Sequence, residues 1–148
     1  MTLPRKAKKG GIKVFERVRY DDLNSRQQEN YNFQKVAGRL ADYGFNCLRL
    51  TDDWQGADFI ACHMDGETFL KIQLKGRLTI DRKYTGKEIY IAFLWGEDCY
   101  VYPHDEFLAG LIERGALREE SNLWQERGIR SWPRPPAWAI QMLSDYRI

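Results

Sequence analysis

The chain has 148 residues, of which 43% are hydrophobic and 30% charged, and its formal net charge is +2. This length suits one domain with a buried core, and the composition excludes an intrinsically disordered chain. No apolar run approaches the roughly 20 residues that a bilayer-spanning helix needs. No apolar segment follows the basic N-terminus as it does in a secretory signal. The three widely spaced cysteines (Cys47, Cys62 and Cys99) indicate reduced thiols, so we expect a cytoplasmic protein that does not enter a membrane.

A first predicted helix starts at Ser25, where Ser25 to Gln28 fits a capping box, and ends before Gly44. Its apolar residues recur at three- and four-residue spacing, as on the buried face of a helix. Glu29 falls on that apolar face, four residues before Phe33. A carboxylate there either needs a partner or complements the positive end of the helix dipole, and the sequence favours neither interpretation.

A strand from Phe45 to Leu50 and a polar turn lead into a predicted hairpin, in which Asp65-Gly66 is typical of a two-residue turn. In this register Asp58 lies directly opposite Gln73, and Lys75 points to the same face. One carboxylate, one amide oxygen and one ammonium then converge on one patch of sheet. The alternative is that this face is the solvated side of a surface hairpin, and a bulge would shift the register.

The rest of the chain adds a basic loop, an apolar strand (residues 89–95), a short strand (99–102) and a helix ending at Gly115. A Trp- and Pro-rich stretch and a terminal helix (137–146) follow. The three tryptophans of this region either pack on the sheet, form an oligomer contact or stack on bases. The order of elements predicts an α/β protein with a mixed sheet of the α+β kind.

Basic residues gather in the first 13 residues and again between Lys71 and Lys87. Such clusters are often solvated surface, but two of them, one beside the hairpin, favour nucleic acid over a small anionic metabolite. The residues that we assign to nucleic-acid binding are Lys8, Lys9, Arg77, Arg82, Lys83 and Lys87.

Together, the helix, the strand and a hairpin with Gly56-x-Asp58 and Gln73-x-Lys75 resemble the PD-(D/E)XK nuclease superfamily over roughly residues 25 to 113. The resemblance implies a restriction-endonuclease-like αβββαβ core in residues 23–115. A basic N-terminal arm (1–22) would precede it, and a Trp/Pro-rich extension (116–148) would pack on it or mediate oligomerisation. Ala57 replaces the motif's Pro, and Gln73 replaces its middle acidic residue, as in a homing-endonuclease- or resolvase-like variant.

The resemblance implies an endonuclease that hydrolyses phosphodiester bonds in DNA with Mg²⁺ or Mn²⁺, with RNA left open as a substrate. Asp58, Gln73, Lys75 and Glu29 would be catalytic, and Asp58, Gln73 and the Leu74 carbonyl would hold the metal. A neutral amide at position 73 weakens metal binding. The alternative is a catalytically inactive nuclease-fold module that binds nucleic acid or a protein partner. A nuclease this small that cuts two strands is expected to act as a homo-oligomer.

Overall fold

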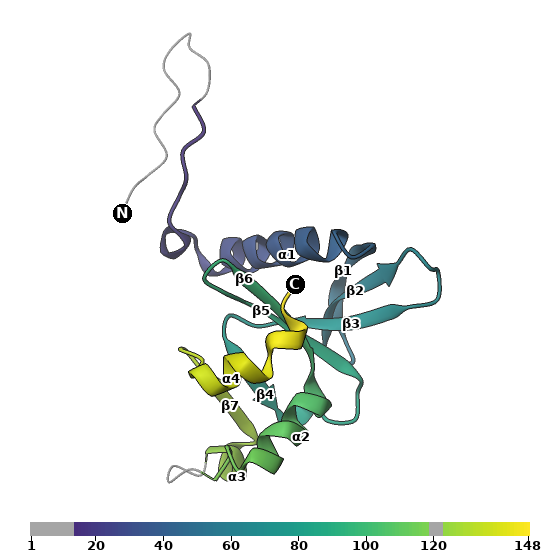
Figure 1. Cartoon of the computed structure of the whole chain (residues 1–148). Coiled ribbons are helices and arrows are strands. Elements are labelled where there is room, and N and C mark those ends of the chain that lie inside the picture. The colour runs from purple at the N-terminus through teal and green to yellow at the C-terminus, as the bar shows by residue number, and fades with distance from the viewer. Residues whose placement is uncertain (1–13, 119–122) are drawn as a thin grey trace. The chain divides into compact units, whose positions relative to one another are not determined.

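The chain divides into two compact units, Met1–Tyr31 and Asn32–Ile148, with the boundary inside helix α1 (Ser25–Ala41). The computed structural model describes residues 14–118 and 123–148 (Figure 1). The basic segment with Lys8 and Lys9 lies outside the described residues, so its role in binding nucleic acid stays a prediction.

In the N-terminal unit, a short 3-10 helix (η1, Tyr20–Asp22) precedes α1. The capping box of α1 is formed by Asn24 and Gln27, not by Ser25 as predicted. The main-chain N–H of Asn24 donates to the Gln27 side chain, and the N–H of Gln27 donates to the Asn24 side chain, each at 2.9 Å. Asn and Ser are about equally good cap residues, and here the three-residue spacing to Gln27 selects Asn24.

A five-stranded mixed sheet forms the centre of the second unit, which confirms the predicted α/β class. Its strands are β1 (Phe45–Trp54), β2 (Ala57–His63), β3 (Phe69–Leu74), β5 (Ile89–Trp95) and β6 (Asp98–Pro103). Their order in the sheet is β1-β2-β3-β5-β6. All neighbours are antiparallel except β3 and β5, which run parallel. β5 is a central strand, in agreement with its uninterrupted apolar sequence.

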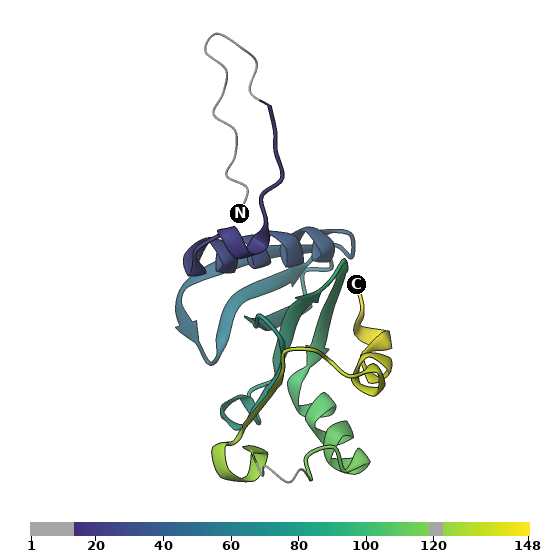
Figure 2. The same ribbon diagram turned by 90° about the vertical axis from the view of Figure 1, so that its left-hand side faces the viewer.

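The part of α1 that belongs to this unit covers one face of the sheet (Figure 2). Val36 and Leu40 are buried against Phe59 and Ile72 of the β2–β3 hairpin. The ring of Phe33 meets that of Phe59 edge to face, with 5.1 Å between their centroids. This apolar contact leaves the opposite face of the hairpin for other partners.

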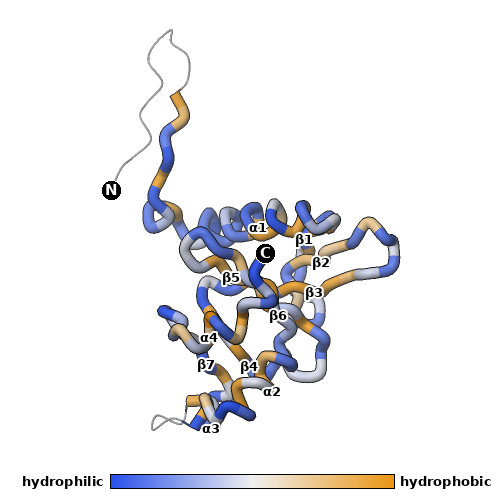
Figure 3. Tube along the Cα trace, in the orientation of Figure 1, coloured by the Kyte–Doolittle hydropathy of each residue, from blue (hydrophilic) through white to orange (hydrophobic). Residues whose placement is uncertain are grey.

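The second core lies on that opposite face, and the helices and strands that follow the hairpin build it. These elements are β4 (Leu78–Asp81), α2 (His104–Arg114), α3 (Leu123–Arg127), β7 (Ile129–Trp132), α4 (Ala137–Met142) and the 3-10 helices η2 (Arg82–Tyr84) and η3 (Ser144–Tyr146). Trp132 and Leu143 are buried in this core, and β4 pairs with β7 in a separate two-stranded sheet. Figure 3 shows hydrophobic stretches along the strands and hydrophilic residues along the loops.

The predicted basic loop between the third and fourth sheet strands instead contains β4 and η2. β4 is held by the hydroxyl of Tyr102 on β6, which accepts a hydrogen bond from the N–H of Thr79 and donates one to its carbonyl. One side chain therefore replaces the strand neighbour that β4 lacks on this side.

Among the described residues, no helix is long and apolar enough to cross a bilayer.

The β2–β3 hairpin has the predicted register, from Phe59 paired with Ile72 to Cys62 paired with Phe69. Its turn is longer than the predicted two residues. The first closing bond runs from the His63 N–H to the Thr68 carbonyl (2.9 Å), and the Asp65 carboxylate accepts from main-chain N–H groups within the loop. An Asp side chain that bonds its own loop stabilises this wider turn.

Candidate active site

Asp58, near the start of β2, is fixed to the end of β3 by its own carboxylate. Its Oδ2 accepts a hydrogen bond from the main-chain N–H of Leu74 at 2.8 Å. The pairing of Phe59 with Ile72, continued by one residue, places Asp58 across from Gln73. The structure therefore brings Asp58 and the β3 end together, with the carboxylate half-buried on the hairpin.

Gln73 and Leu74 contribute two further polar groups at the same strand end. The side-chain Nε2 of Gln73 donates to the carbonyl oxygen of Leu74 at 3.3 Å. Both residues are partly buried. The side chains of Gln73 and Asp58 therefore both bond the main chain of Leu74, Gln73 at its carbonyl and Asp58 at its N–H.

Lys75 follows directly and is anchored to the neighbouring strand, because its main-chain N–H donates to the Ala92 carbonyl of β5 at 2.9 Å. Its ammonium lies 5.3 Å from the centroid of the Tyr84 ring. Burial lowers the pKa of Lys75, and the positive charge of Lys83 lowers it further, whereas Asp81 and Asp58 act in the opposite direction. Lys75 is thus a partly desolvated cation in the field of Asp58.

Tyr84 of η2 forms a platform under this lysine, and the sequence analysis did not identify it. Its side chain is 3% exposed, and a second ammonium, that of Lys83, lies 5.2 Å from its ring centroid. The ring lies directly against Gly56: a Cβ added there would be 3.0 Å from a ring carbon. Gly56 also has a φ of +89°, so both its backbone conformation and its missing side chain serve this contact.

Three carboxylates act electrostatically on the Tyr84 hydroxyl. Burial raises the pKa of Tyr84 well above its usual value, and the negative charges of Asp81, Asp58 and Asp53 raise it further. Asp81 and Asp58 also act on Lys75. The candidate site therefore combines two cations and several carboxylates around one buried ring.

Helix α2 holds η2, and with it Tyr84, in place. His104 is fully buried, and its Nε2 accepts from the main-chain N–H of Asp81 at 3.0 Å. Its Nδ1 lies 2.9 Å from Oδ1 of Asp105, so the neutral ring carries its proton on Nδ1 and donates to that carboxylate. Asp105 accepts a further hydrogen bond from the Gly86 N–H (2.9 Å), and Asp81 caps η2 through the Lys83 N–H (3.0 Å).

The remaining predicted site residues that the structure describes are Glu29, Arg77, Arg82 and Lys87. Glu29 is an exposed residue of the N-terminal unit, and its assigned role stays a prediction. Arg77 is exposed just before β4, and Lys87 is half-buried after η2. The Arg82 guanidinium donates to the Trp124 carbonyl at 2.8 Å and lies 5.0 Å from the centroid of the Trp124 ring.

Within residues 14–118 and 123–148, no three His, Cys, Asp or Glu side chains are grouped so that they could hold a metal. The oxygen atoms at the end of the hairpin thus include one carboxylate, that of Asp58, together with an amide and a main-chain carbonyl. Any metal at this point would depend on ligands from outside these three residues.

No family model and no curated protein matches the chain. Part of it is similar to the solved structure of I-Ssp6803I, a bacterial homing endonuclease, with 19% identity and a TM-score of 0.43 over 58% of this chain and 70% of that one. Another part-match is Hjc, a Holliday junction resolvase from the archaeal hyperthermophile Archaeoglobus fulgidus, with 16% identity and a TM-score of 0.41 over 51% and 72%.

Proposed function

We propose that the start of β2 and the end of β3 form the active site of a metal-dependent endonuclease that hydrolyses phosphodiester bonds in DNA. The site would be a PD-(D/E)XK variant with Gln73 at the middle acidic position. The observation that carries this proposal is the hydrogen bond from the Leu74 N–H to Asp58. It fixes one carboxylate beside a partly desolvated lysine, Lys75, on a sheet face that α1 does not cover.

The chemistry of the ligand atoms fits Mg²⁺ or Mn²⁺. Asp58, the Gln73 amide oxygen and the Leu74 carbonyl are hard oxygen donors, and Mg²⁺ is commonly bound by one or two carboxylates together with waters and substrate phosphates. A site with one carboxylate would therefore be completed by the DNA phosphate. Such a metal supplies polarisation of the phosphate and a bound water of lowered pKa.

The chain's own groups have separate tasks in this proposal. Asp58 is held by Leu74, so it is preorganised to bind the metal without a rotamer change. Lys75 orients the attacking water and offsets the negative charge that develops on the phosphate. Tyr84 keeps the Lys75 ammonium in position from below, and the Lys83 ammonium adds positive charge at the same ring.

Basic residues around this point would contact the DNA backbone, which supplies affinity and register but no sequence information. Arg77, Lys83 and Lys87 border the site along the chain, and Lys8 and Lys9 of the N-terminal arm would add to them. The core assigned to residues 23–115 would carry the chemistry. A symmetric homo-oligomer would place one such site on each DNA strand.

A second candidate function is a nuclease-fold module that binds nucleic acid without cutting it. The contact of the Gln73 side chain with the Leu74 carbonyl favours this alternative. In that arrangement the Gln73 amide is hydrogen-bonded to the Leu74 carbonyl. Asp58 is then the one carboxylate of the proposed ligand set. This alternative predicts DNA binding that persists in chelator and an absence of cleavage.

The test is to incubate the protein with plasmid DNA and with a random-sequence target library in Mg²⁺ or Mn²⁺, with and without chelator. Asp58→Ala and Lys75→Ala are assayed in parallel. We expect metal-dependent cleavage that both substitutions abolish. Cleavage that persists in both variants would contradict the assignment of the site. Binding without any cleavage of the library would select the non-catalytic module.

A further inference from the structure

Away from the candidate site, three arginines of the second unit each lie over the ring of a tryptophan. The guanidinium carbon lies 5.0 Å from the ring centroid for Arg82 and Trp124, 4.8 Å for Arg114 and Trp138, and 4.5 Å for Arg130 and Trp132. We call these six residues the Arg–Trp track. The tryptophans of the C-terminal segment thus do more than fill the core, because each also supports a cation.

Two links join the three pairs into one surface. The rings of Trp132 and Trp138 meet edge to face at 6.4 Å, which places Arg130 and Arg114 on adjoining indoles. The main-chain N–H of Arg82 donates to the Gly128 carbonyl at 2.7 Å, two residues before Arg130. β4 and β7 are paired along this stretch. Arg82 directly follows β4, Arg130 is on β7, and Arg114 is at the end of α2.

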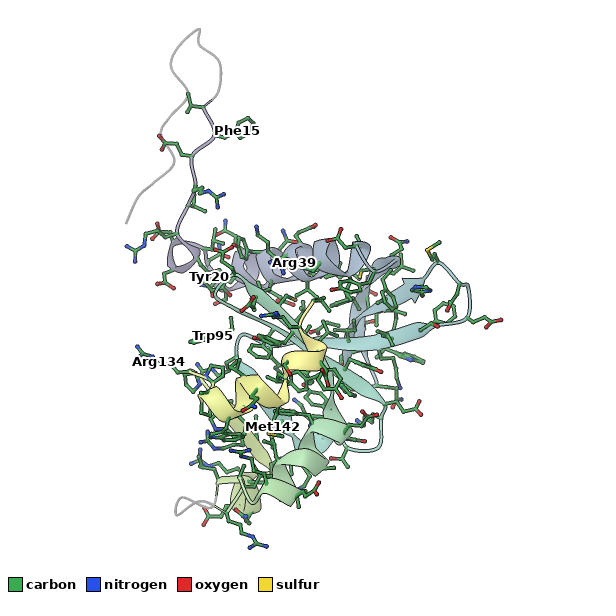
Figure 4. The ribbon with its side chains drawn as sticks, in the orientation of Figure 1. Phe15, Tyr20, Arg39, Trp95, Arg134 and Met142 are labelled. Atoms are coloured by element: carbon green, nitrogen blue, oxygen red, sulfur yellow. The ribbon has the colours of Figure 1, made fainter. Side chains whose placement is uncertain are left out.

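The track carries an excess of positive charge. The stretch 114–134 contains five arginines and three glutamates. Arg114, Arg118 and Arg134 are exposed, and Figure 4 shows Arg134 reaching outward from the segment between β7 and α4.

The track is continuous with the candidate site. Lys83 directly follows Arg82, and its ammonium lies over the same Tyr84 ring as the ammonium of Lys75. Cationic groups therefore run from the proposed scissile position along η2 to β7 and the end of α2. A polyanion bound at Lys75 would meet this row of charges next.

The stacked geometry suits a phosphate ligand. An indole ring holds a guanidinium flat by a cation–π interaction and keeps water from one face, so less conformational freedom is lost when the edge N–H groups bind. Those N–H groups form a fork that matches two phosphate oxygens. A DNA strand repeats this phosphate ligand at every nucleotide, so several such arginines can each bind one.

We propose that the Arg–Trp track binds the phosphate backbone of duplex DNA beside the scissile position. This inference rests on the proposed function, from which DNA is taken as the ligand. It assigns the C-terminal segment to substrate binding, whereas the sequence left that segment as packing, oligomer contact or base stacking.

The test measures the binding of a labelled random-sequence duplex by fluorescence anisotropy, in chelator, over a series of salt concentrations. The double variant Arg82→Gln/Arg114→Gln removes the two exposed charges of the track. A charge-matched control, Lys35→Gln/Arg147→Gln, removes two exposed charges elsewhere in the same unit. Thermal unfolding of all three proteins establishes that each is folded.

We expect the track variant to bind about tenfold to a hundredfold more weakly at moderate salt and to lower the slope of log K against log salt by about two. The control should change affinity by less than about twofold. Equal weakening in both variants, or none in the track variant, would overturn the inference. Either result would overturn only the role of the track, because the wild-type protein would still bind and cleave DNA. If the wild-type protein bound no DNA at low salt, the proposed function itself would be refuted.

Discussion

The contact between Gly56 and Tyr84 supports the candidate site, and Gly56→Ala tests it. Gly56 has a φ of +89°, a conformation that costs an alanine about 1–2 kcal/mol. The new Cβ would also lie 3.0 and 3.2 Å from two ring carbons of Tyr84 and 3.6 Å from Ile89. Because Tyr84 is buried, relieving this clash should cost about 1–3 kcal/mol more. The expected total loss in the free energy of unfolding is about 2–5 kcal/mol.

Gly66→Ala is the matched control, because Gly66 has a φ of +74° but no heavy atom within 4 Å of an added Cβ. It should lose only the backbone term of about 1–2 kcal/mol. Urea unfolding of both variants measures the difference, and thermal midpoints should drop by about 2–4 °C for each kcal/mol lost. Equal losses in the two variants would refute the packing of Tyr84 under Gly56.

Three further results are expected. Asp58→Ala should destabilise the fold by about 1–3 kcal/mol in urea unfolding, because it leaves the Leu74 N–H without its acceptor. Asp58→Asn keeps an acceptor oxygen and should lose less. Equal losses in the two variants would speak against that hydrogen bond. His104→Phe should cost about 2–3 kcal/mol in the same assay, because a buried ring loses two hydrogen bonds; an unchanged midpoint would be inconsistent with this network. The Thr68 hydroxyl, followed by main-chain N–H groups, holds the pKa of Asp65 well below its usual range. The stabilisation that the ionised Asp65 carboxylate gives the folded state is therefore present above about pH 4. It is lost as the pH falls through the pKa that Asp65 has in the folded state. In an NMR titration of the carboxyl carbon, Thr68→Val should raise the Asp65 pKa, and an unaltered value would exclude the hydroxyl as the cause.

The hairpin register could be predicted from the sequence because strand side chains alternate with a period of two, and a shift by one residue would have exposed Phe59 and Ile72. The turn was predicted too short. The Asp-Gly pair indicated a turn at the right place, but the Asp65 carboxylate bonds the loop main chain, a side-chain contact that a dipeptide signal does not specify.

Tyr84 could not be found in the same way. The short strand β4 and η2 lie in a stretch with no clear periodicity, and Tyr84 reaches the site through a contact with Gly56 that is distant in sequence. The same limit applies to Arg82, which was assigned to nucleic acid from its charge. Its guanidinium contacts Trp124 and caps the Trp124 carbonyl, which only the folded chain reveals.

The central claim is that the start of β2 and the end of β3 hold a divalent metal. Mn²⁺ binding, followed by electron paramagnetic resonance of the free ion, tests it without knowledge of the DNA target. The wild-type protein should bind Mn²⁺ saturably. Asp58→Asn should weaken binding by about tenfold or more, because it removes the one carboxylate ligand. Gln73→Glu should tighten binding, because it restores a second negative charge. Equal Mn²⁺ affinities for all three proteins would contradict the account.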